Sequence, residues 1–136
     1  MKTISSAIEN QVFVLQDMEK VLKPMGFVIG GNWDYDHGSF DYKLATDGGY
    51  QFLRIPFKTE DGELDQDGAI VRIQKPYMLT HVYQGDEDHA AIGNFTATVN
   101  QFQEPIEKDA HVPEEYMKKG RSLIKQVESA LLGIRN

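Results

Sequence analysis

The amino-acid sequence predicts an α+β fold, with an antiparallel sheet of about four to six strands and two helices packed on one of its faces. Three observations support this prediction. Apolar and polar residues alternate over much of residues 27–83, which is the period of strands that bury one face. Glycine-containing turns separate the alternating segments. Apolar residues at helical spacing occur both before and after this region.

Length and charge limit the classes of protein to consider. The 136 residues suffice for one domain, predicted to span residues 1–136, and are too few for two comfortable domains. Fourteen basic residues against 21 acidic ones give a formal charge of -7, which repels phosphate backbones and anionic membranes, so neither nucleic acid nor a membrane is an expected partner.

The chain contains no cysteine, which excludes disulfides, thiol catalysis and zinc–thiolate sites. The first residues, MKTISSAIENQ, hold no apolar run of signal-peptide length, and no stretch reaches the roughly 18 apolar residues of a membrane span. These observations predict a cytoplasmic protein.

The first helix is predicted over residues 11–23. Asn10 is the expected N-cap, because its side-chain oxygen can accept a free backbone N–H, and Pro24 and Gly26 end the helix. Residues 1–9 fit either a short edge strand or an irregular lead-in. The apolar side of this helix contains Val14 or Leu15, Met18, Val21, Leu22 and Met25.

Two turns set the predicted register of the sheet. A hairpin centred on His37 and Gly38 pairs Tyr35 with Phe40, Trp33 with Tyr42, and Asp34 with Asp41. A second hairpin centred on Asp47 and Gly48 pairs Phe40 with Ile55, Tyr42 with Leu53, and Asp41 with Arg54. Both registers place the large apolar residues, including an aromatic cluster of Trp33, Tyr35, Phe40 and Tyr42, on the face that forms the core.

Further elements follow the second hairpin. An acidic loop is predicted over residues 60–67, a strand over 69–75, a bend at Pro76, and extended structure over 77–83. Residues 93–99 can add another strand. The last helix begins near Pro113, with Glu114 and Glu115 in its first turn. Its apolar stripe contains Tyr116, Gly120, Leu123, Ile124, Val127, Leu131 and Ile134.

The face of the sheet opposite the helices is the predicted functional surface. Its row Asp34–Asp41–Arg54 could bind a cation or a basic ligand group, could act as an acid–base pair, or could be a ladder of solvated surface charges. Tyr50 and Phe52 share this face, which indicates a dimer interface or a platform for a small-molecule ligand. His81, which alternates with Leu79 and Tyr83, is either a packed strand residue or part of the same site.

No metal or cofactor is predicted. Residues 63–74 match part of a calcium loop, but Gln74 stands at the twelfth position, where a bidentate glutamate is needed. The four histidines, His37, His81, His89 and His111, lack the spacing of a metal site. No GxSxG, P-loop or GxGxxG motif is present, so no catalytic residue can be assigned from a motif.

Two segments, GFVIGGNWDYDHGSFDYK over residues 26–43 and NQFQEPIEKDA over residues 100–110, resemble the YugN-like family of small proteins from Bacillus-type bacteria. The resemblance implies a cytoplasmic bacterial protein of α+β type, and it brings no assigned activity, cofactor or site residue. The favoured function is a non-enzymatic interaction or ligand-binding domain that self-associates. The alternative is a small-molecule or metal-dependent enzyme that uses Asp34, Asp41 and Arg54, together with His81.

Overall fold

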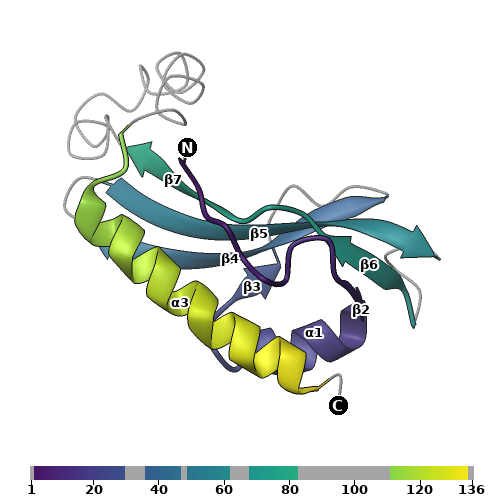
Figure 1. Cartoon of the computed structure of the whole chain (residues 1–136). Coiled ribbons are helices and arrows are strands. Elements are labelled where there is room, and N and C mark those ends of the chain that lie inside the picture. Colours follow the sequence, from purple (N-terminus) through teal and green to yellow (C-terminus); the bar gives the residue numbers. More distant parts are fainter. Residues whose placement is uncertain (1, 30–35, 47–48, 62–67, 83–110, 135–136) are drawn as a thin grey trace, which may run out of the picture.

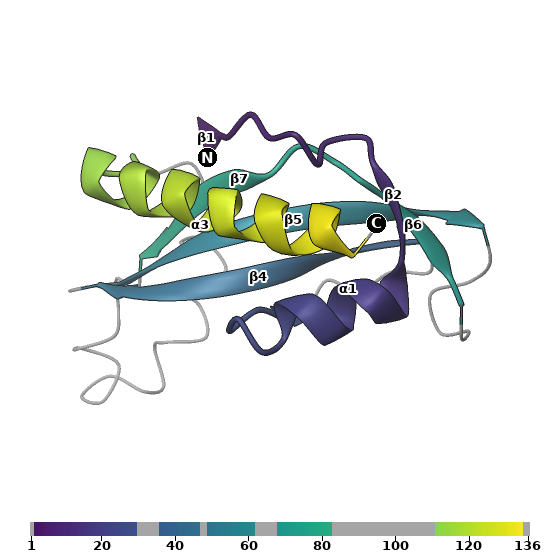
Figure 2. The same ribbon diagram turned by 60° about the horizontal axis from the view of Figure 1, so that its bottom comes forward.

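The computed structural model describes residues 2–29, 36–46, 49–61, 68–82 and 111–134. Within them, a seven-stranded antiparallel sheet has helices α1 and α3 on one side (Figures 1 and 2), which confirms the predicted α+β class with more strands than expected. The elements are β1 (Lys2–Thr3), β2 (Val12–Val14), α1 (Leu15–Leu22), β3 (Val28–Ile29), β4 (His37–Thr46), β5 (Gly49–Asp61), β6 (Ile70–Ile73), β7 (Tyr77–Val82) and α3 (Glu114–Gly133).

The long strand β5 organises the sheet. The strand order is β1-β7-β5-β4-β3, and β6 pairs with β5 and with β2. One half of β5, from Gly49 to Arg54, pairs with β7, and the other half, from Phe57, pairs with β6. Pro76 lies between β6 and β7, as predicted, because a proline cannot donate the backbone hydrogen bond that would continue the ladder.

The register of β4 on β5 is the one that the Asp47-Gly48 turn predicts. Phe40 faces Ile55, Asp41 faces Arg54, and Tyr42 faces Leu53. Phe40, Leu53 and Ile55 are fully buried. The alternation therefore places the apolar residues of both strands in the core, as expected for a sheet with one covered face.

The predicted register of the preceding strand is wrong. Val28, and not Asp34, is the partner of Asp41, and Ile29 is the partner of Phe40. His37 and Gly38 lie inside β4, opposite Lys58 and Phe57, so they do not form a turn. The predicted and the observed partners of Asp41 differ by an even number of residues, so the same residues of each strand still face the core. Phe27 is 1% exposed, whereas Val28 is 60% exposed.

The first helix begins later than predicted. Residues 12–14 form β2, which pairs with β6 and places Phe13 opposite Val71, and α1 starts only at Leu15. Asn10 is not the N-cap. It has a φ of 68° and donates its backbone N–H to the Ile73 carbonyl oxygen at 2.7 Å. The available edge of β6 and the strand-favouring sequence Val-Phe-Val explain the difference.

The two ends of the chain agree only in part with the sequence-based expectations. Residues 2–3 form a short edge strand on β7, with irregular structure after it. Helix α3 follows Pro113, and Gly120, Ile124, Val127 and Leu131 of the expected stripe are buried. Ile134 is 44% exposed and so lies off the stripe, and Met117, which was not assigned to it, is buried.

The core lies between the sheet and the helices. Gly120 allows α3 to approach β7 closely, because a Cβ atom there would lie 2.7 Å from Met78 Sδ and 3.2 Å from Ile4 Cδ1. A buried polar pair links neighbouring strands β5 and β7: the Thr80 hydroxyl donates to Gln51 Oε1 at 2.8 Å and lies 3.1 Å from the carbonyl oxygen of His111, which precedes α3. The core cluster contains Ile4, Ile8, Phe13, Leu15, Met18, Leu22, Phe27, Phe40, Leu53, Ile55, Phe57, Ala69, Val71, Ile73, Met78, Val112, Met117, Ile124, Val127 and Leu131.

Several predictions lie outside the described residues. They concern Asp34, Trp33 and Tyr35, the end of the extended segment at Tyr83, the acidic part of the calcium-like loop, the strand over residues 93–99, and His89.

Candidate functional site

The side of the sheet turned away from α1 and α3 is here called the second face. On β4, β5 and β7, its residues alternate with core residues such as Phe40, Leu53 and Met78. The structure brings together on this face five of the six residues that the sequence singled out. The second face contains Ser39, Asp41, Lys43, Tyr50, Phe52, Arg54, Tyr77, Leu79 and His81.

An ion pair between Asp41 and Arg54 occupies the middle of the second face. Arg54 donates Nε to Asp41 Oδ1 and Nη2 to Asp41 Oδ2, both at 2.9 Å. The Asp41 side chain is 9% exposed and that of Arg54 is 24% exposed. Such a two-pronged pair is both strong and directional, because the planar guanidinium matches the carboxylate edge.

Neighbouring residues complete this ion pair. Ser39, two residues before Asp41 on β4, donates its hydroxyl to Asp41 Oδ1 at 3.0 Å. Tyr77 is the β7 partner of Arg54. The hydrogen bonds to Asp41 raise the pKa of Arg54 above its usual value, and a further hydrogen bond with Tyr77 acts in the same direction. Both oxygens of the carboxylate are therefore engaged, which favours a role in fixing the strands over a role as a base.

Aromatic side chains cover the adjoining part of the second face. The Tyr50 and Phe52 rings lie 6.2 Å apart between centroids, and Phe52 meets the His81 ring edge-on at 6.5 Å. The Lys43 ammonium lies 4.4 Å from the centroid of the Tyr50 ring, within range of a cation–π interaction. Tyr50, Phe52 and His81 are all half-buried. These residues form a surface of rings with one cation at its margin.

The predicted acid–base row is only partly present. Val28 takes the place opposite Asp41 that was expected for Asp34, so the pairing of two carboxylates across adjacent strands is wrong. Among the residues that the structure describes, no group of three or more histidine, aspartate or glutamate side chains could hold a metal ion.

Sequence reasoning missed three contributors to the second face. Ser39 and Tyr77 support the ion pair, and Leu79 is only 8% exposed although it lies outside the core cluster. Alternation along β4 and β7 could have identified them. Ser39 lies two residues from Asp41 and so on the same face, and Tyr77 and Leu79 lie an even number of residues from His81 and so share its face.

Comparisons with known proteins agree with the resemblance found in the sequence. The YugN-like family matches residues 3–131. The chain is 50% identical over 133 residues to the uncharacterized protein YugN of Bacillus subtilis (strain 168), covering 97% of this chain and 99% of that protein. It is 23% identical over 99 residues to the uncharacterized protein YlbA of the same organism, covering 73% and 82%.

A solved structure shows the same fold. The crystal structure of the uncharacterized conserved protein YugN from Geobacillus kaustophilus HTA426 superposes with a TM-score of 0.77 at 22% identity, over 99% of this chain and 98% of that one. In the part of the chain described here, no helix is long and apolar enough to cross a membrane. The match of the family over nearly all of the sequence, together with the 50% identity to a relative, shows that this chain belongs to the YugN-like family.

Proposed function

We propose that this protein is a non-enzymatic interaction domain that pairs with a second copy of itself through the second face of the sheet. The observation that carries the proposal is the group of contacting rings, Tyr50, Phe52 and His81, on the second face. Figure 2 shows that both α1 and α3 lie on the other side of the sheet. Aromatic residues and arginine are enriched in protein–protein interfaces, and a two-fold dimer uses the same patch on both copies.

The ion pair supports a binding role more than a chemical one. A general base needs a free lone pair directed at its substrate. Asp41 instead accepts hydrogen bonds from Ser39 and from two nitrogens of Arg54. The pair thereby fixes the register of β4 on β5 and holds the neighbouring rings at a constant position. A rigid, pre-organised surface loses less entropy when it binds a partner.

The second candidate is a small-molecule or metal-dependent enzyme that uses the same face. It would rely on Asp41, Arg54 and His81; the predicted third charge, Asp34, lies outside the described residues. A variant of this candidate binds a small molecule without catalysing a reaction. The Lys43 ammonium beside the Tyr50 ring favours an anionic compound as that ligand. For each of these candidate functions, the proposed location of the protein is the cytoplasm.

Two lysine–tyrosine stacks provide a matched test of the dimer proposal. Lys43 stacks on Tyr50 on the second face, and Lys119 stacks on Tyr116 on α3. We expect the unmodified protein to show a dimer mass by light scattering coupled to gel filtration. Lys43→Glu should raise the dissociation constant of the dimer about tenfold or more, because it reverses a charge at the edge of the interface. Lys119→Glu should leave the constant unchanged.

Two results would reject self-association through this face. One is a monomer mass for the unmodified protein across the concentrations tested. The other is an equal effect of Lys43→Glu and Lys119→Glu. A monomer whose thermal midpoint rises with one compound from a panel of metal ions and metabolites, and no longer rises in Asp41→Asn, would instead support the ligand-binding alternative.

A further inference from the structure

The N-terminal strap, residues 2–11, runs along the β7–β6 edge of the sheet beside α3 (Figure 1). Backbone hydrogen bonds tie its two ends: Ile4 N–H donates to the Pro76 carbonyl at 2.9 Å, and Asn10 N–H donates to the Ile73 carbonyl at 2.7 Å. The side chains of Ile4 and Ile8 insert into the core and are 4% and 0% exposed.

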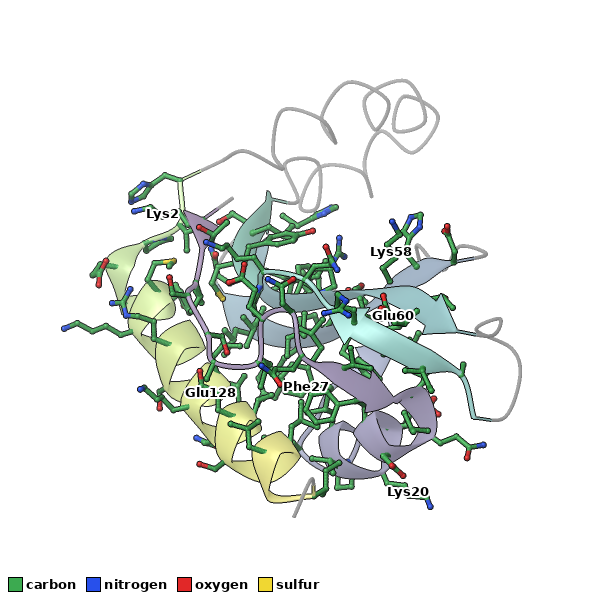
Figure 3. The ribbon with its side chains drawn as sticks, turned by 45° about the vertical axis from the view of Figure 1, so that its right-hand side comes forward. Lys2, Lys20, Phe27, Lys58, Glu60 and Glu128 are labelled. Atoms are coloured by element: carbon green, nitrogen blue, oxygen red, sulfur yellow. The ribbon has the colours of Figure 1, made fainter. Side chains whose placement is uncertain are left out.

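A single carboxylate of α3 holds the middle of the strap. Glu128 Oε2 accepts the Ser6 hydroxyl at 2.8 Å and the Ala7 backbone N–H at 2.9 Å. Figure 3 shows Glu128 where α3 passes the strap. The hydrogen bonds from Ala7 and Ser6, together with the positive charge of Lys125, lower the pKa of Glu128, so the carboxylate is charged at neutral pH.

We propose that Glu128 is a latch, and that the strap, including β1, opens as a unit while the other strands and the helices stay folded. The short strand β1 contributes only two residues to the sheet and pairs with β7. The strap therefore adheres mainly through two isoleucines, its terminal backbone bonds and the latch. Segments with few buried contacts open more often than the core to which they are attached.

Opening of the strap would uncover a specific part of the core. Ile4 of the strap and Met78 of β7 both pack against Gly120 of α3, since a Cβ atom at position 120 would lie within 3.2 Å of both side chains. When the strap leaves, this apolar seam between α3 and β7 becomes accessible from the edge of the sheet. The device would thus regulate access to an apolar surface that is separate from the second face.

Thiol labelling can measure this opening, because the chain has no cysteine and each variant then carries a single thiol. Ile8→Cys reports on the strap and Ile55→Cys reports on the centre of the sheet, and both isoleucines are 0% exposed. We expect Ile8→Cys to be labelled at least about tenfold faster than Ile55→Cys under native conditions. Adding Glu128→Gln should accelerate labelling only at position 8, and Glu115→Gln, on the exposed side of α3, should change neither rate.

Equal labelling rates at the two positions would overturn the proposal, because the strap would then open only when the whole protein unfolds. If Glu128→Gln accelerates labelling equally at positions 8 and 55, or at neither position, Glu128 does not hold the strap closed. If Ile8→Cys does not fold, hydrogen exchange at the Ala7 amide decides the matter in a chain with Glu128→Gln as its sole substitution. The proposal requires this amide to exchange faster than in the unmodified protein while amides of β4 and β5 keep their rates.

Discussion

The two faces of the sheet bury side chains in different ways. The helix-covered face is almost wholly apolar, and its side chains belong to one core with those of α1 and α3. The second face instead holds an ion pair and a group of half-buried rings. An apolar layer that its own helices cover stabilises the fold. A rigid layer of rings and paired charges is better suited to contact with another molecule.

Two phenylalanines of β5 provide the strongest test of this difference. Phe57 lies in the core, 0% exposed and 5.4 Å from the Phe40 ring, whereas Phe52 lies half-buried on the second face. Phe57→Ala should reduce the free energy of unfolding by about 3–5 kcal/mol, because it leaves a cavity in the core. Phe52→Ala should cost about 1 kcal/mol. Urea unfolding measures both, and equal losses would mean that the two faces are equally buried within the monomer.

The ion pair should be the next most sensitive feature. Arg54→Ala leaves the nearly buried Asp41 carboxylate without its cation, and we expect a loss of about 2 kcal/mol in unfolding free energy. Asp41→Asn in that background should recover part of the loss, because it removes the unpaired charge. Arg121→Ala, which breaks an exposed pair with Glu114, is the control and should cost much less, because solvent screens that pair. A similar cost for both arginines would contradict a buried pair on the second face.

A smaller effect is expected at the contact between α3 and β7. Gly120→Ala places a methyl group 2.7 Å from Met78 Sδ, so the Met78 side chain must shift within the core. We expect the free energy of unfolding to fall by about 1 kcal/mol, even though alanine is a better helix former than glycine. Thermal melts of the two variants measure the effect, and Gly133→Ala, where a Cβ atom would meet nothing within 4 Å, should be neutral or slightly stabilising. An equal gain in stability from Gly120→Ala and Gly133→Ala would show that α3 and β7 are not closely packed at Gly120.

Acid should weaken the helix-covered side through Glu128. Its pKa is lowered in the folded protein, so its contribution to stability is present above the unfolded pKa, near 4.5, and is lost as the pH falls through the lowered value. The difference in unfolding free energy between the unmodified protein and Glu128→Gln should therefore shrink as the pH falls from near 4.5 through the lowered pKa of Glu128. A difference that does not depend on pH would exclude the charge of Glu128 as its source.

The smallest effect should have the opposite sign. Within the described part of the chain, Thr59 Oγ1 is buried and has no hydrogen-bond partner, and Thr59 pairs with Val71 in the sheet. Thr59→Val keeps the shape and removes the unsatisfied hydroxyl, so it should stabilise the protein by up to about 1 kcal/mol. Differential scanning calorimetry would detect the rise in melting temperature, and a fall would indicate that the hydroxyl is satisfied in solution.

The sequence predicted the faces of the sheet better than it predicted the partners within it. The Asp47-Gly48 turn gave the register of β4 on β5 correctly, because a tight hairpin leaves little freedom between its strands. The connection from β3 to β4 is longer, and the glycine at position 38 was mistaken for its turn. Alternation still placed Phe27 and Asp41 on opposite faces, since any even shift preserves parity.

The remaining differences come from contacts between distant parts of the chain. Residues 12–14 have an apolar pattern that fits a helix, but β6 offers them an edge to pair with, and that edge is formed about sixty residues later. The ion pair was predicted as a row of three charges. Its support by Ser39 and Tyr77 depends on side-chain directions on two strands, which a single sequence specifies only through parity.

Hydroxyl-radical footprinting at increasing protein concentration tests the role of the second face most directly. The account predicts that Tyr50, Phe52 and His81 become protected as the concentration rises from low micromolar to millimolar, while Tyr116 on α3 keeps its reactivity. Unchanged reactivity of all three rings over that range, or equal protection of Tyr116, would contradict it.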